Sequence, residues 1–68
     1  MEWVIVTYKR ERDVFVDGRR AGFTNRKLIV IEGTHRFDLG TPADYTPSRR
    51  IVTVTDTAES QPKTVEFS

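Results

Sequence analysis

Short runs of β-branched, aliphatic and aromatic residues alternate with polar turns along the whole chain. The first run, residues 3–8 (WVIVTY), contains only strong β-formers. Apolar and polar residues alternate in residues 35–39 and 51–55, which is typical of half-buried strands, and no segment shows helical spacing over a useful length. The pattern predicts an all-β sandwich or barrel of about six to seven short strands. We expect strands at residues 3–8, 14–16, 28–31, 35–39, 51–55 and 63–67.

The stretch VFVDGRRAG contains two glycines among basic residues and has two interpretations. A phosphate-binding loop would need a helix directly after it and several glycines with converging backbone N–H groups. The residues after Gly22 do not begin a helix. A D-G pair between β-forming residues is instead a strong hairpin signal. We therefore expect a tight hairpin turn at Asp17-Gly18, with Gly22 in a strand at a bulge or a close backbone approach.

The alternation of apolar and polar residues also predicts which side chains are buried in the core. His35, Phe37 and Leu39 are expected on one face of a strand, because residues two apart share a face, and Arg36 and Asp38 are expected on the other. The predicted core positions are Val4, Val6, Val14, Val16, Leu28, Val30, Phe37, Leu39, Val52, Val54, Val65 and Phe67.

The size of the chain limits this core. The sequence has 68 residues, which predicts one domain over residues 1–68 with only a few kcal/mol from a single core. There is no cysteine, so disulfides and thiolate metal sites are excluded. Docking on a neighbouring domain or weak self-association is an expected compensation for a thin core. No apolar run approaches the roughly 20 residues of a membrane span, and the N-terminal MEWVIVTYKR does not have the pattern of a signal peptide; localisation stays open.

The same motifs resemble those of the PEGA domain family. The order is V-F-V-D-G, a glycine four residues later, Thr24, L-x-V, and then E-G-x-H-x-F-x-L. The stretch that names the family aligns with Ile31-Glu32-Gly33-Thr34, so only the central E-G is kept, and His35 and Tyr45 match residues that follow it. Two V-x-hydrophobic strands complete the resemblance, which covers residues 14–67.

The resemblance implies a small antiparallel β-sandwich of Greek-key type. Domains of this family are accessory modules of prokaryotic proteins, often in a surface or envelope context and beside enzymatic or signalling domains. The family has no defining catalytic residues. The function implied for this chain is a non-catalytic module that supports protein–protein or surface contacts, with an unknown protein or a neighbouring domain as the partner.

Residues of possible chemical interest each have a simpler structural interpretation. His35 is the only histidine, and metal or acid–base sites need several convergent groups, so we expect a half-buried, hydrogen-bonded histidine. Asp13, Asp17 and Asp38 could form a carboxylate pair, but a chain this short leaves little room for a catalytic cleft. We expect no enzyme activity, no metal and no cofactor.

Basic pairs and aromatic residues give two alternative functions. A small β-barrel can bind single-stranded nucleic acid with a basic groove and exposed aromatic rings, although a net charge of +1 argues against specific nucleic-acid binding. A carbohydrate- or cell-wall-binding module would instead need Trp3 or Tyr45 exposed on a flat face. The surface residues that we single out as binding candidates are Arg19, Arg20, Arg26, Lys27, Tyr45, Arg49 and Arg50.

Overall fold

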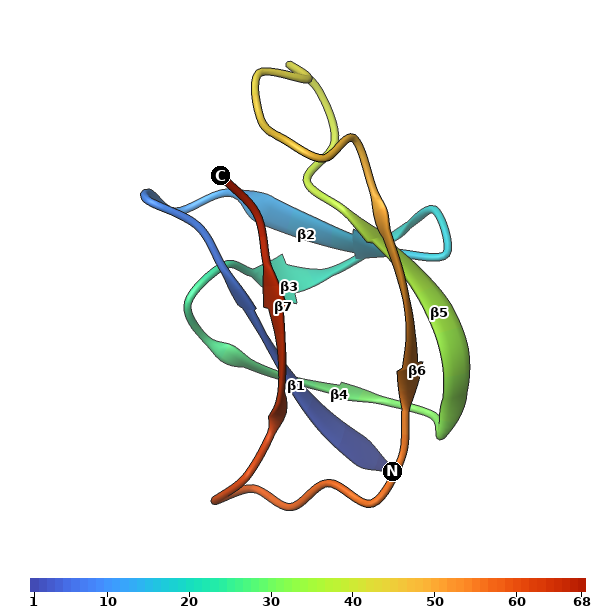
Figure 1. Cartoon of the computed structure of the whole chain (residues 1–68). Helices are drawn as coiled ribbons and strands as arrows, with labels where there is room; N and C mark the ends of the chain where they lie inside the picture. Colours follow the sequence, from blue (N-terminus) through green and yellow to red (C-terminus); the bar gives the residue numbers. More distant parts are fainter.

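The computed structural model describes all 68 residues and contains strands but no helix. The strands are β1 (Glu2–Thr7), β2 (Asp13–Val16), β3 (Arg19–Phe23), β4 (Lys27–Val30), β5 (Gly33–Asp38), β6 (Arg50–Val54) and β7 (Lys63–Glu66). They form a three-stranded sheet in the order β4-β1-β7 and a four-stranded sheet in the order β3-β2-β5-β6 (Figure 1). The predicted all-β fold is confirmed, and the structure has no helix long and apolar enough to cross a membrane.

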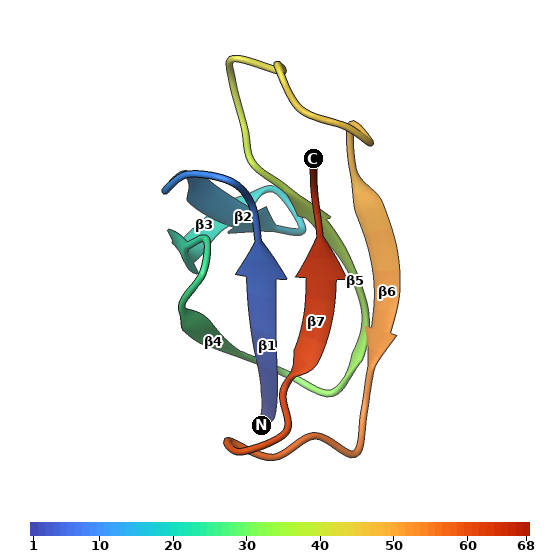
Figure 2. The same ribbon diagram turned by 60° about the vertical axis from the view of Figure 1, so that its left-hand side comes forward.

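The path of the chain alternates between the two sheets. The connections β1–β2, β3–β4, β4–β5 and β6–β7 each pass from one sheet to the other, as expected of a Greek-key type of sandwich. One pairing differs from the antiparallel expectation, because β1 and β7 are parallel (Figure 2). No hairpin links these two strands, so their relative direction is set by the crossover from β6 and not by a tight turn.

The hairpin predicted at Asp17-Gly18 joins β2 to β3. Both residues have positive φ, 53° for Asp17 and 84° for Gly18, which is the type I′ pattern that matches the twist of the flanking strands. Gly22 lies beside the expected bulge, whose extra residue is Ala21, and what approaches it closely is a side chain and not a backbone. The register shifts beside Gly22, so that β3 carries a bulge, and a Cβ at Gly22 would collide with the side chain of Leu28.

The core lies between the sheets and agrees with the alternation in the sequence. Ten of the twelve predicted core residues are buried, and Val16 and Val52 are partly buried against the same cluster. Tyr8, Tyr45 and Thr24 are buried in addition to the predicted set. Phe37 and Leu39 are buried as expected, while the side chain of His35 on the same face keeps 15% exposure.

Candidate functional site

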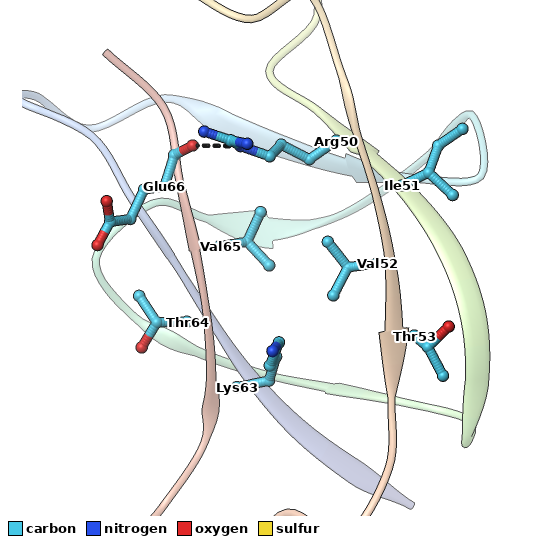
Figure 3. Close-up of a pocket in the computed structure, with 8 residues that line it drawn as sticks. All are labelled: Arg50, Ile51, Val52, Thr53, Lys63, Thr64, Val65 and Glu66. Atoms are coloured by element: carbon cyan, nitrogen blue, oxygen red, sulfur yellow. Dashed lines mark hydrogen bonds between the residues drawn. The ribbon is translucent and has the colours of Figure 1, made fainter.

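The two sheets leave an opening on the side where β6 faces β7. Each of these strands is the last strand of its sheet, and no ladder joins them to each other. Residues 50–53 of β6 and 63–66 of β7 line a groove of about 480 Å³ at this place (Figure 3). The opening therefore exposes two strand edges to the same space.

The main-chain groups of β6 that face the opening follow from the hydrogen bonds of β5. The N–H of Asp17 donates to the carbonyl oxygen of Arg36 at 2.8 Å, so the main chain of Arg36 faces β2. Main-chain groups of successive residues in a strand point to alternate sides, and the partner of Arg36 in the β5–β6 register is Ile51. The N–H and C=O groups of Ile51 and Thr53 consequently point away from β5, into the opening.

The same reasoning applies to β7. The N–H of Phe67 donates to the carbonyl oxygen of Thr7 at 3.0 Å, so the main chain of Phe67 faces β1. The main-chain groups of Thr64 and Glu66 therefore face the opening. Only the carbonyl oxygen of Glu66 has a partner there, the Nε–H of Arg50, which donates to it at 2.9 Å.

One end of the opening is already occupied by the chain itself. Thr46 and Ser68 exchange two main-chain hydrogen bonds of 2.7 and 2.8 Å. Ser68 lies two residues beyond Glu66, so Thr46 takes up the position of an added strand on the outer edge of β7. No other segment of the chain pairs with the outward main-chain groups of Thr64, so the outer edge of β7 is uncovered there.

Side chains inside the opening form an apolar centre between two basic ends. Val52 from β6 and Val65 from β7 point into the groove, as do Arg50 and Lys63, whereas Ile51 and Thr53 point away from it (Figure 3). None of the ion pairs in the structure involves Arg50 or Lys63. The opening can therefore accept an extended segment through main-chain hydrogen bonds and offers unpaired positive charge at both ends.

The predicted basic pairs are not gathered in one place. Arg19 and Arg20 lie on β3. Arg50 begins β6, on the opposite edge of the four-stranded sheet, and Arg49 directly precedes it. The guanidinium carbons of Arg20 and Arg26 lie 4.6 and 5.4 Å from the ring centre of Phe23.

The charges of this stacked pair are neutralised within the chain. Arg20 pairs with Asp13 and Arg26 pairs with Glu11. Lys27, next to Arg26, is exposed on the edge strand β4. Of the predicted basic residues, only Arg50 lines the opening between β6 and β7.

Tyr45 was expected as a surface residue, and this prediction is wrong. Its side chain is buried, with an edge-on contact to Phe67 at 5.6 Å between ring centres. The hydroxyl accepts from the N–H of Leu39 and donates to the carbonyl oxygen of Gly40. Tyr45 thus holds the loop before β6 and places the neighbouring Thr46 against Ser68. The polar residues around Tyr45 suggested an exposed loop. An aromatic residue in a loop can nevertheless fold back into the core, and the local sequence does not show this.

His35, on β5, links the β2–β3 turn to the connection between β4 and β5. Its Nδ1 lies 2.6 Å from a carboxylate oxygen of Asp17, and its Nε2 lies 2.6 Å from the carbonyl oxygen of Ile31. The Asp17 carboxylate, and then the Ile31 carbonyl, raise the pKa of His35. The N–H of Arg36, followed by His35, lowers the pKa of Asp17. This arrangement matches the structural role expected for the histidine, and no group of three or more potential metal ligands occurs in the chain.

Sequence reasoning missed most of the residues of the opening. Thr53 and Thr64 lie in expected strands, and nothing in their immediate sequence marks their main chain as unpaired. Strand order decides which edges are free, and here the order depends on crossovers between sheets. A weak signal was available at Ile51, an exposed β-branched residue beside two arginines at the start of a strand.

Comparisons of the chain with protein-family models, with curated proteins and with solved structures found no match. The resemblance to PEGA domains, expected from the motifs of residues 14–67, therefore stays a prediction.

Proposed function

We propose that this chain is a non-catalytic accessory module that binds a partner protein or a neighbouring domain by strand addition. In this mode an extended segment of the partner lies in the opening between β6 and β7 and pairs with the main chain of β6. The observation that carries the proposal is the outward direction of the N–H and C=O groups of Ile51 and Thr53. Strand addition uses main-chain hydrogen bonds for affinity and side-chain pockets for specificity.

The other strand edges are less suited to this role. Natural proteins protect their edges with charged residues, bulges or short strands. β3 carries two arginines and a bulge, and β4 has four residues beginning with Lys27. The edge of β7 is partly covered by Thr46 and by Arg50. In contrast, β6 has no proline and no bulge, and its outer edge has no partner in the chain.

The experiment uses a displayed library of random heptapeptides, selected on the immobilised chain. Selected peptides should bind with protection of the Ile51 and Thr53 amides from hydrogen exchange, while the Val52 amide, already paired with β5, changes little. Thr53→Pro should abolish binding, because it removes an outward main-chain donor. It leaves the main-chain hydrogen bonds of the β5–β6 ladder in place, as edge strands permit, and loses only the exposed hydroxyl contact with Thr34.

The matched control is Ile29→Pro. The main chain of Thr7 faces β7, so by alternation that of Val4 faces β4. Val4 pairs with Leu28, so the main chain of Leu28 faces β1 and that of Ile29 faces outward on β4, as that of Thr53 does on β6. This variant should bind as the parent does, and amide spectra should show that both variants are folded. Peptides that bind Thr53→Pro as tightly as the parent would contradict the proposal. If Thr53→Pro does not fold, unchanged exchange at Ile51 and Thr53 in the parent on peptide binding would contradict it equally.

A further inference from the structure

We infer that the segment received by the opening carries an acidic residue, a spacer, an aliphatic residue, a spacer and a second acidic residue. This inference rests on the proposed function and adds the chemistry of the partner. It follows from the side chains of the groove, whereas the proposed function follows from the main chain.

The aliphatic position is set by the floor of the groove. Val52 and Val65 point toward each other from β6 and β7 (Figure 3). Val65 is buried, and Val52 remains partly exposed. An extended segment between the strands directs every second side chain inward. An aliphatic side chain in the middle of the segment would cover Val52 and remove apolar surface from water.

The acidic positions are set by the ends of the groove. Arg50 precedes Val52 by two residues, and Lys63 precedes Val65 by two residues, so each shares the inward face of its strand. β6 and β7 run in opposite directions (Figure 2), which places Arg50 at one end of the valine pair and Lys63 at the other. Side chains two positions before and after the aliphatic residue would therefore meet one cation each.

Arg50 is held ready for a carboxylate. Its Nε–H donates to the carbonyl oxygen of Glu66, which fixes the guanidinium across the opening and leaves four N–H donors free. Arginine binds carboxylates through two parallel hydrogen bonds. The carboxylate of Glu66 points out of the groove (Figure 3) and forms no ion pair with Arg50. The charge at this end is therefore available to a ligand.

The test compares blocked heptapeptides of defined sequence by NMR titration of the Ile51 and Thr53 amides. The probe is Thr-Glu-Thr-Val-Thr-Glu-Thr. The first comparison peptide has glutamine in place of both glutamates. The second, Thr-Thr-Glu-Val-Glu-Thr-Thr, has the same composition but places its acids on the face opposite the valine. The probe should bind about fivefold more tightly than either comparison peptide, since two partly exposed ion pairs together contribute on the order of 1 kcal/mol.

The double variant Arg50→Gln with Lys63→Gln should remove this advantage, and 1 M salt should reduce it because exposed charges are screened. Lys27→Gln, an exposed lysine on β4, is the matched control and should leave the advantage unchanged. Equal affinity of the three peptides would overturn the acidic pattern and leave the main-chain pairing of β6 standing. Failure of all three to shift the Ile51 and Thr53 amides would overturn this inference, and the library selection would then decide the proposed function by itself. If the double variant does not fold, the comparison of the peptides on the parent protein still decides the inference.

Discussion

His35 has a hydrogen-bond acceptor at each ring nitrogen. The Asp17 carboxylate faces Nδ1 and the Ile31 carbonyl faces Nε2. A neutral imidazole has only one N–H, so only the protonated ring can donate to both. The two contacts join the β2–β3 turn to the connection between β4 and β5, and the charge on one side chain therefore influences two turns.

Stability should depend on pH through this histidine. The pKa of His35 is raised in the folded state, so its contribution is complete below the unfolded value of about 6.5 and is lost as pH rises through the folded value. Urea unfolding of the parent should show a free energy of unfolding that falls from pH 6 to pH 9. His35→Gln, which cannot become charged, should show a flatter dependence over this range. An equal fall in both proteins would contradict this role of His35.

The acidic side of the profile has a different cause. The pKa of Asp17 is lowered, chiefly by the N–H of Arg36, so the contribution of Asp17 is present above the unfolded value of about 3.9 and is lost as pH falls through the lower folded value. The contribution of Asp44 to stability is likewise lost as pH falls, since Arg12 lowers the pKa of Asp44.

At the residue scale the sequence predicts the backbone conformation of a residue better than it predicts the hydrogen-bond partners of its side chain. Asp17 was correctly expected in a turn because the D-G pair has a local preference. Its bond to His35 joins residues 18 apart, and no local preference encodes that. Thr24 shows the same limit. It is buried, and its hydroxyl bonds the main chain of Arg10 and of Arg12, yet nothing in its neighbourhood distinguishes it from an exposed turn threonine.

At the scale of elements, the β2–β3 hairpin depends on its turn. Gly18→Val should lower the free energy of unfolding by at least about 1–2 kcal/mol, because a φ of 84° is costly for a residue with a Cβ and more so for a β-branched one. Gly18→Asn is the matched control and should lose less, since asparagine tolerates this region. Chemical denaturation measures both. Equal losses would mean that the Cβ contact with the Arg36 side chain, rather than the backbone, sets the cost.

Strand positions were predictable because alternation is local, and strand neighbours were not. The runs at residues 3–8, 28–31 and 51–55 became β1, β4 and β6 with small changes at their ends. The parallel pairing of β1 with β7 joins segments about sixty residues apart. The opening could not be predicted from the sequence for the same reason: β6 and β7 become neighbours only because the chain crosses between the sheets.

At the scale of the whole molecule, the positive charges are dispersed and partly neutralised. Arg10 and Arg12 pair with Asp44, and Arg20 and Arg26 pair with other acids. A nucleic-acid-binding surface needs clustered basic residues. We therefore expect only weak, salt-sensitive association, weaker than micromolar, with single-stranded or duplex oligonucleotides near physiological salt. Fluorescence anisotropy checks this, and micromolar or tighter binding that persists in that salt would support the alternative function.

The parallel pair β1–β7 has a consequence for force. The N-terminus lies at one end of this pair and the C-terminus at the other (Figure 2). Tension applied between the two ends therefore pulls the strands past each other in shear, and the bonds of their ladder must yield together. An antiparallel hairpin pulled at its two ends would unzip one bond at a time. Forced unfolding is governed by the unfolding rate, so shear loading of the β1–β7 ladder should make the chain resist tension between its ends.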